Sequence, residues 1–140
     1  MSTIAAQAIT VEPPTGRLTA SLRRTTVTTG LAGAAVTTAV AALLRAAGTP
    51  LSVKGEIPLL GFAQITFIGA VLGGVIAAVL SRRSAQPRRR FVQVTVTLTV
   101  LSCIAPLTMA SGAVDKLALT ATHLVAAAII IPVLARRVDA

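Results

Sequence analysis

The chain has 140 residues, a formal net charge of +9, 54% hydrophobic residues and only 12% charged residues. That charged share is about half the share in an ordinary soluble domain, so the sequence lacks the residues for a solvated outer surface. A tightly buried soluble helical core is the alternative, but each of its helices would need a polar stripe, and four long runs here contain no charge. We therefore predict one integral membrane domain.

The positive charge does not indicate a nucleic-acid-binding protein. The arginines cluster at the ends of the apolar runs, and the side chains that stack on bases are scarce, with three Phe, no Tyr and no Trp. Anionic lipid headgroups are the expected partners of these arginines. The side chains predicted to contact headgroups are Arg23, Arg24, Arg82, Arg83, Arg88, Arg89, Arg90, Arg136 and Arg137.

Residues 1–24 are predicted to form a mobile cytoplasmic tail, because two prolines and a glycine between Glu12 and Gly16 interrupt any helix. The membrane domain is predicted over residues 25–137, and its first span over residues 26–44. Small residues and threonines dominate this span and permit close helix contact, so it should be the helix most surrounded by protein. A cleaved twin-arginine signal stays open as an alternative, although the residues after the arginine pair fit that motif poorly.

The second span is predicted at residues 58–80, and it carries closely spaced glycines. Gly69 and Gly73 form a GxxxG pattern, and Gly74 repeats the four-residue spacing with Ala70. Glycines at this spacing are typical of close helix–helix contact in membranes. We therefore predict that Gly69, Gly73 and Gly74 pack against a neighbouring helix.

The segment Ser81–Arg90 holds five arginines in ten residues and separates the second span from a third, predicted at residues 91–110. The fourth span is predicted at residues 117–135, and residues 138–140 form a C-terminal tail. Pro106 should kink the third span, because it removes a helix hydrogen bond. The sequence thus predicts an all-α integral membrane four-helix bundle, with two transmembrane hairpins joined by a basic cytoplasmic loop.

The orientation in the membrane follows from the basic residues. If both termini and the central loop share one side, that side holds ten arginines, and the other side holds Arg45, Lys54 and Lys116. Basic residues concentrate on the cytoplasmic side of membrane proteins. Both termini are therefore predicted to be cytoplasmic, and the protein is predicted to lie in the inner, or cytoplasmic, cell membrane.

Several polar residues inside the predicted spans fall at one depth. Each is about seven residues from the outer end of its span, or roughly 10 Å at about 1.5 Å per residue. This candidate polar layer, which indicates a small outward-facing pocket, consists of His123, Gln64, Cys103, Thr37 and Thr38.

Two interpretations of His123 stay open. An ionisable residue inside a span is a functional candidate by default, as a group that titrates or binds a ligand. In the other interpretation, which we prefer, a neutral His123 forms an interhelical hydrogen bond with Gln64 or a threonine, and no carboxylate within any span would stabilise a charged ring. Glu56 and Asp115 are predicted to be solvated loop charges above this layer.

The residues argue against several kinds of chemistry. The single cysteine, Cys103, can form no intramolecular disulfide, and one histidine with one cysteine is not a zinc-binding pattern. Thr95, Thr99 and Ser102 share one face of the third span, but the sequence shows no nucleophile–base pair, phosphate-binding loop or paired carboxylates. We predict no enzyme activity, no metal and no cofactor.

The fourth span carries a family resemblance. It reads His123-Leu124-Val125 in its first half and ends with an Ile-Pro-Val-Leu-Ala-Arg-Arg run that closes at Arg137. Together with Pro106, these residues resemble a family of small actinobacterial four-helix membrane proteins of unknown function, over about residues 25–137. The family often has methionine before the histidine, where this chain has Thr122. The resemblance implies the fold and the membrane location but no activity.

The residues favour a structural or interaction subunit, which forms a homo-oligomer or binds another membrane protein. The alternative is a small transporter or channel, or a holin-like pore, with a polar pocket around His123. Four-helix drug exporters of similar length rely on a carboxylate inside the first span, whereas no span of this chain contains one.

Overall fold

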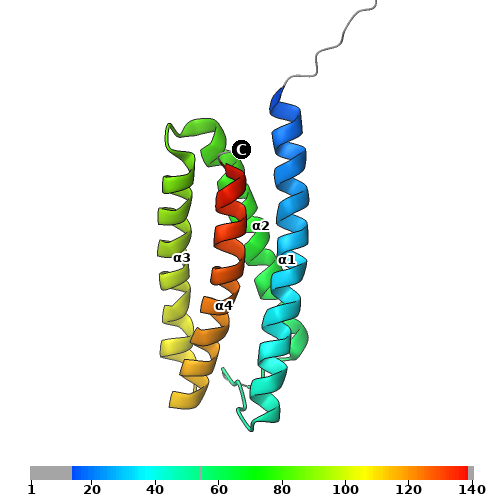
Figure 1. The fold of residues 1–140 in the computed structure, drawn as a ribbon. Coiled ribbons are helices and arrows are strands. Elements are labelled where there is room, and N and C mark those ends of the chain that lie inside the picture. The colour runs from blue at the N-terminus through cyan, green and yellow to red at the C-terminus, as the bar shows by residue number, and fades with distance from the viewer. Residues whose placement is uncertain (1–13, 54, 139–140) are drawn as a thin grey trace, which may run out of the picture.

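The computed structural model describes residues 14–53 and 55–138. In this part of the chain the fold consists of the helices α1 (Pro14–Ala46), α2 (Leu59–Arg83), α3 (Pro87–Met109) and α4 (Ala113–Val138), arranged as a bundle (Figure 1). Each helix is long and apolar enough to cross a membrane. The predicted all-α four-helix fold is confirmed, and the chain is a small membrane protein.

Helix α1 begins earlier than the predicted first span. Its first residue is Pro14, and proline suits that position because its φ is already helical and its missing N–H needs no partner there. Residues 14–24 of the predicted tail are therefore helical. The rest of the predicted N-terminal tail, residues 1–13, lies outside the described residues. So do residues 139–140 of the predicted C-terminal tail, whose first residue, Val138, ends α4.

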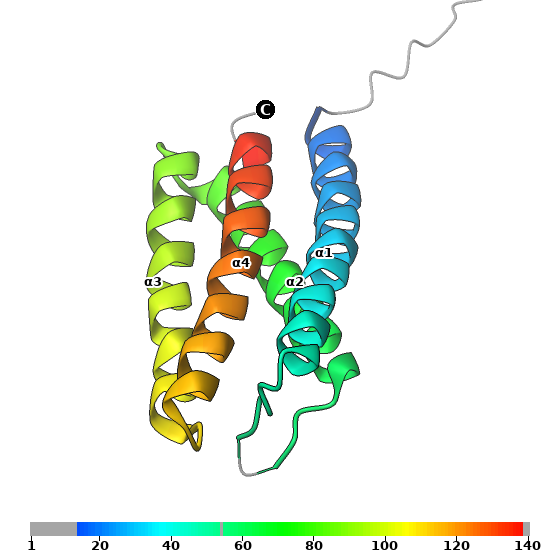
Figure 2. The same cartoon turned by 60° about the horizontal axis from the view of Figure 1, so that its bottom comes forward.

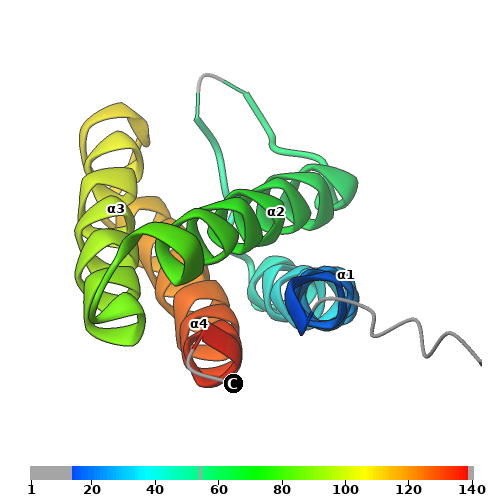
Figure 3. The same cartoon turned by 90° about the horizontal axis from the view of Figure 1, so that it is seen from above.

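Helices α1 and α3 lie on opposite flanks of the bundle and share no contact among the described residues, whereas every other pair of helices is in contact. Helix α2 crosses the bundle obliquely (Figure 3). The end of α2 next to the turn into α3 lies beside α3, and its other end lies beside α1 (Figures 1 and 3). Helices α2 and α3 therefore diverge as they leave their shared turn.

The bundle has two chemically different ends. The start of α1, the α2–α3 turn and the end of α4 lie together at one end, which we call the arginine end (Figure 1). The nine arginines predicted to contact headgroups are in these segments, and all nine are exposed. The α1–α2 loop and the α3–α4 turn lie at the opposite end (Figure 2).

Helices α1 and α2 approach closely because both carry small residues where they cross. A Cβ atom added at Gly74 of α2 would lie only 3.0 Å from the Cβ of Thr26 in α1. A Cβ added at Gly30 of α1 would lie 3.1 Å from the Cβ of Ala70, which is fully buried in α2. This α1–α2 seam therefore depends on the missing side chains of two glycines.

The three glycines predicted to pack against a helix do not share one role. Gly74 packs on Thr26, and a Cβ added at Gly73 would lie 3.3 Å from a methyl group of Leu134 in α4. Gly69 is exposed, and a Cβ there would meet no atom within 4 Å. The prediction is therefore wrong for Gly69 within this chain, because the oblique crossing of α2 turns the face with Ala70 and Gly74 toward α1.

Asp115 in the first turn of α4 binds the α1–α2 loop at the end of the bundle opposite the arginine end. Its Oδ1 accepts a hydrogen bond of 3.0 Å from the backbone N–H of Leu51, and its Oδ2 accepts one of 2.9 Å from the hydroxyl of Ser52. The side chain is only 4% exposed, so the prediction of a solvated loop charge is wrong for Asp115. Glu56 is exposed. Leu51, Ser52 and Asp115 form a clasp between the α1–α2 loop and α4, and this end is called the clasp end below.

The clasp holds the loop in an unfavourable backbone conformation. Leu51 has a φ of 51°, in the left-handed region, although its side chain is fully buried. Such a conformation costs a non-glycine residue about 1–3 kcal/mol and persists only where surrounding contacts enforce it. Arg45 at the end of α1 also donates a hydrogen bond to the carbonyl of Ile57, so the loop is tied to α1 as well as to α4.

The α1–α2 seam predicts opposite effects for two glycines of the same helix. Gly74→Ala should destabilise the bundle by about 1–3 kcal/mol, the usual cost of overpacking, because the Cβ of Thr26 is fixed to its backbone and cannot rotate away. Gly69→Ala is the matched control and should leave stability unchanged or raise it, since alanine is the better helix former. Unfolding of both variants in mixed micelles measures this. Equal losses would show that the seam is not the tight contact.

The clasp predicts a loss of stability when its carboxylate is removed. Asp115→Ala leaves the buried N–H of Leu51 without a partner and should cost about 1–3 kcal/mol, whereas Asp115→Asn keeps an acceptor oxygen and should cost less. Glu56→Ala, at an exposed position in the same loop, should change stability by less than about 0.5 kcal/mol. The same unfolding measurement tests all three variants. A neutral effect of Asp115→Ala would contradict the clasp.

Candidate binding pocket

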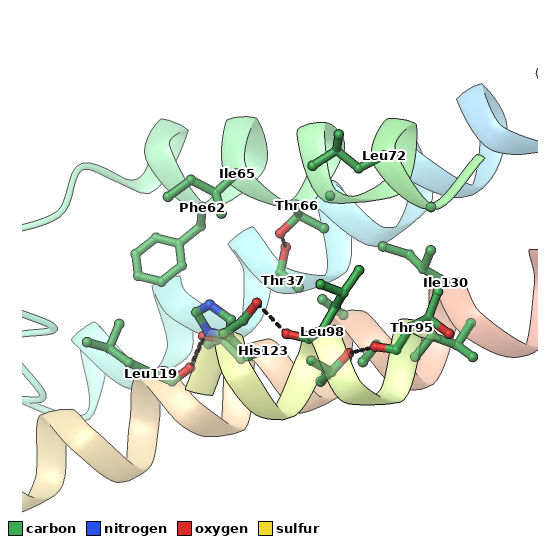
Figure 4. A pocket seen from close by; sticks show the side chains of 18 of the residues that line it. Thr37, Phe62, Ile65, Thr66, Leu72, Thr95, Leu98, Leu119, His123 and Ile130 are labelled. Carbon is green, nitrogen blue, oxygen red and sulfur yellow. Dashed lines mark hydrogen bonds between the residues drawn. The ribbon is translucent and has the colours of Figure 1, made fainter. Parts of the chain in front are cut away.

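A pocket of about 340 Å³ lies between α2, α3 and α4, on the side of the bundle away from most of α1 (Figure 4). Phe62 and Leu119 line it toward the clasp end, and both belong to the buried apolar cluster of that end. Phe91 and Ile130 line it toward the arginine end and belong to the second cluster. Packed apolar side chains therefore bound the pocket at both ends of the bundle.

The pocket opens sideways between α2 and α3. On α2 the lining residues Ile65 and Leu72 are 62% and 58% exposed, and on α3 the lining residue Leu98 is 45% exposed. Gly69 also lines the pocket and is exposed. Side chains that both line a pocket and reach the surface form its rim, and the apolar rim here faces the side of the bundle that lies in the membrane.

Most hydroxyl groups of the pocket are satisfied within their own helix. The hydroxyl of Thr95 donates to the carbonyl of Phe91 at 2.7 Å, and that of Thr99 donates to the carbonyl of Thr95 at 2.8 Å. Ser102 and Thr122 make the same kind of bond, at 2.8 and 2.7 Å. Hydroxyls that bond back to their own helix need no partner from a ligand. The face of α3 with Thr95, Thr99 and Ser102 thus lines the pocket without making it strongly polar.

Thr37 joins α1 to the pocket. Its hydroxyl lies 2.9 Å from the hydroxyl of Thr66 in α2 and 2.9 Å from the carbonyl of Gly33. A carbonyl can only accept, so Thr37 donates to Gly33, and Thr66 donates to Thr37. Thr37 and Thr66 are therefore joined by a hydrogen bond between α1 and α2. Each hydroxyl donates within the protein and needs no acceptor from a ligand.

His123 hydrogen-bonds within its own helix. Its Nδ1 lies 2.9 Å from the carbonyl oxygen of Leu119, and since a carbonyl only accepts, Nδ1 carries the proton and donates. The expected interhelical bond to Gln64 or a threonine is therefore wrong. In the neutral ring Nε2 is then an acceptor, and among the described residues it has no hydrogen-bond partner. Figure 4 shows the ring at the pocket between Leu119 and Phe62.

The predicted polar layer is only partly assembled. His123 and Thr37 line the pocket, but Gln64 is exposed and does not. Cys103 is buried outside it, and the hydroxyl of Thr38 has no hydrogen-bond partner among the described residues. Equal depth placed these residues in one layer, but depth does not determine which helix face a side chain occupies. Thr66 and Thr122 were missed for the same reason, since only the helix–helix contacts show which face lines the pocket.

The pocket shows no arrangement of catalytic or metal-binding groups. Within residues 14–53 and 55–138, no three side chains of His, Cys, Asp or Glu come together. No carboxylate lines the pocket, whose one ionisable side chain among the described residues is that of His123. This environment suits an apolar ligand with few polar groups.

The family model of a family of unknown function, DUF6069, matches residues 17–140. The chain belongs to this family. The match includes all four helices apart from the first residues of α1, so the predicted resemblance to a family of unknown function is confirmed; the expected actinobacterial origin stays a prediction. No curated protein and no solved structure matches the chain.

Proposed function

We propose that this member of DUF6069 is a non-enzymatic binding subunit of the cytoplasmic membrane, which receives an apolar partner molecule in its lateral pocket. The observation that carries the proposal is the pocket itself: about 340 Å³, bounded by three helices and open sideways through an apolar rim. Ligand sites are typically concave and mostly apolar, with a few polar groups that fix orientation, and His123 is such a group here.

The same geometry argues against the alternative of an aqueous pore or channel in this state. A pore needs a continuous polar path between the two ends of the bundle. Apolar clusters that include Phe91 and Leu134 at one end, and Leu51 and Phe62 at the other, occupy that path. A binding subunit needs no path through the bundle, only access from the lipid.

We further propose that the arginine end faces the cytoplasm, where its nine exposed arginines contact anionic headgroups. In a Cys103→Ala background, a cysteine at Ala47 should react with an impermeant thiol reagent added to whole cells, and a cysteine at Ala85 should not. Both positions are exposed and lie at opposite ends of the bundle, so accessibility in the fold is matched. Labelling of the Ala85 position from outside would reverse the orientation.

The binding proposal is tested by what the protein retains when it is extracted in mild detergent. Native mass spectrometry should show an additional bound mass on the wild-type protein and none on Gly69→Leu, because a leucine there enters the pocket and, with open space around it, leaves the fold intact. Ala35→Leu, at an exposed position of α1 outside the pocket, is the matched control and should retain the mass. A bare protein in all three samples, or a bound mass that Gly69→Leu does not remove, would contradict the proposal.

A further inference from the structure

We infer that the pocket takes a single-chain amphiphile with one hydroxyl group, which donates a hydrogen bond to Nε2 of His123 while the chain lies along α4 toward Phe91. This inference rests on the proposed binding function and specifies the chemical class of the partner. Fatty alcohols, prenols and alkylphenols share this chemistry. The shape of the pocket, the absence of any hydrogen bond at Nε2 and the position of this nitrogen each support it.

The shape of the pocket favours a chain over a helix. Its lining on α4 extends from Leu119 to Ile131, a length of about 18 Å at 1.5 Å per residue. An α-helix with its side chains is about 10–12 Å wide, or about 80–110 Å² in cross-section. Helices α2, α3 and α4 line the pocket and contact one another, so a further helix would have to force them apart, whereas one hydrocarbon chain enters the space between them.

The hydrogen bonds of the pocket select the polar group of the ligand. The hydroxyls of Thr37, Thr95, Thr99, Ser102 and Thr122 already donate to helix carbonyls. The oxygens of these hydroxyls can still accept, but among the polar side-chain groups that line the pocket, Nε2 of His123 is the one ring nitrogen or oxygen with no hydrogen bond to the described residues. A ligand that donates one hydrogen bond satisfies it, and a hydroxyl group is the smallest such donor.

The histidine is also poorly explained as a structural residue. The carbonyl of Leu119 that accepts from Nδ1 is the regular acceptor of the His123 backbone N–H four residues on. Without the ring this carbonyl would keep its backbone partner, so the hydrogen bond of the imidazole ties no second helix to α4. What the bond to Leu119 does is fix the ring and its tautomer, which presents Nε2 as the acceptor.

The position of His123 orients the ligand. One turn of α4 lines the pocket on the clasp side of His123, up to Leu119, whereas two turns line it on the arginine side, up to Ile131. The span from His123 to Ile131 is about 12 Å at 1.5 Å per residue. The hydroxyl therefore lies near the clasp end of the pocket, and the chain extends toward the arginine end, where Ala126, Ala127 and Ile130 line its path.

The test uses His123 as the single histidine of the chain, so that labelling with ¹⁵N-histidine gives the Nδ1 and Nε2 resonances of one imidazole ring. In nanodiscs of a saturated phosphatidylcholine, dodecanol should shift the Nε2 resonance, and dodecyl methyl ether, which has a chain but no donor, should not. Octanol should bind more weakly than dodecanol, and hexadecanol should gain little more once the chain fills the pocket. Dodecylphenol in place of dodecanol distinguishes an aromatic from an aliphatic source of the hydroxyl.

Two variants at position 123 separate recognition from folding. His123→Leu should leave the thermal stability of the empty protein unchanged but bind dodecanol about three- to tenfold more weakly, the effect of one lost hydrogen bond, and should no longer prefer the alcohol over the ether. His123→Gln keeps an acceptor and should restore the preference. Dissociation constants come from titration of a photoreactive dodecanol with competition by each ligand.

The outcomes distinguish this inference from the proposed function. If the alcohol and the ether bind the wild-type protein equally, and Gly69→Leu abolishes both, hydroxyl recognition is overturned and the binding pocket stands. If Gly69→Leu weakens neither ligand, or if no chain compound binds at all, the inference and the proposed function fall together. A loss of thermal stability in the empty His123→Leu variant would overturn the claim that the ring has no structural role.

Discussion

The fold depends on how closely α1 and α2 approach each other. At Gly74 the two helices come nearer than a Cβ atom would permit, and at Gly30 a Cβ atom would be tighter against Ala70 than almost any real contact; in a membrane such close packing is a main source of the attraction between helices. Because α2 is held against α1 at this seam, it crosses the bundle obliquely and departs from α3 beyond their shared turn (Figure 3). The pocket is the space that this departure leaves between α2, α3 and α4, so the contact on one side of α2 creates the site on its other side.

The two ends of the bundle keep this arrangement fixed. At the arginine end, Phe91 and Leu134 are fully buried where the helices converge. At the clasp end, Asp115 binds the loop that joins α1 to α2, and the enforced φ of Leu51 shows how firmly that loop is held. Helices that are fixed at both ends can leave an apolar pocket between them. In a bundle held only by uniform side-chain packing, the helices would move together and fill such a pocket.

The apolar runs and the basic segment predict the helices because the length of a span and the basic residues beside it are properties of one stretch of sequence at a time. Contacts between helices could not be predicted as well. Gly69 with Gly73, and Ala70 with Gly74, satisfy the same spacing rule, and only the crossing of α2 with α1 decides that the second pair forms the contact. Asp115 was misjudged because its partner Leu51 is 64 residues away in sequence, so no local pattern could reveal it.

Two features of the pocket are unfavourable for stability, and no contact in the described chain compensates for them. Gly69 lies within a helix, where glycine is less favourable than alanine by about 1 kcal/mol, yet a Cβ there would touch nothing. His123 places an imidazole inside a membrane span, where polar groups are unfavourable unless paired, yet it bonds only to its own helix. Local departures from the rules of stable packing concentrate at functional sites. Both residues line the same pocket, and a chain-like ligand would use both: the open rim at Gly69 to enter, and Nε2 of His123 to be held.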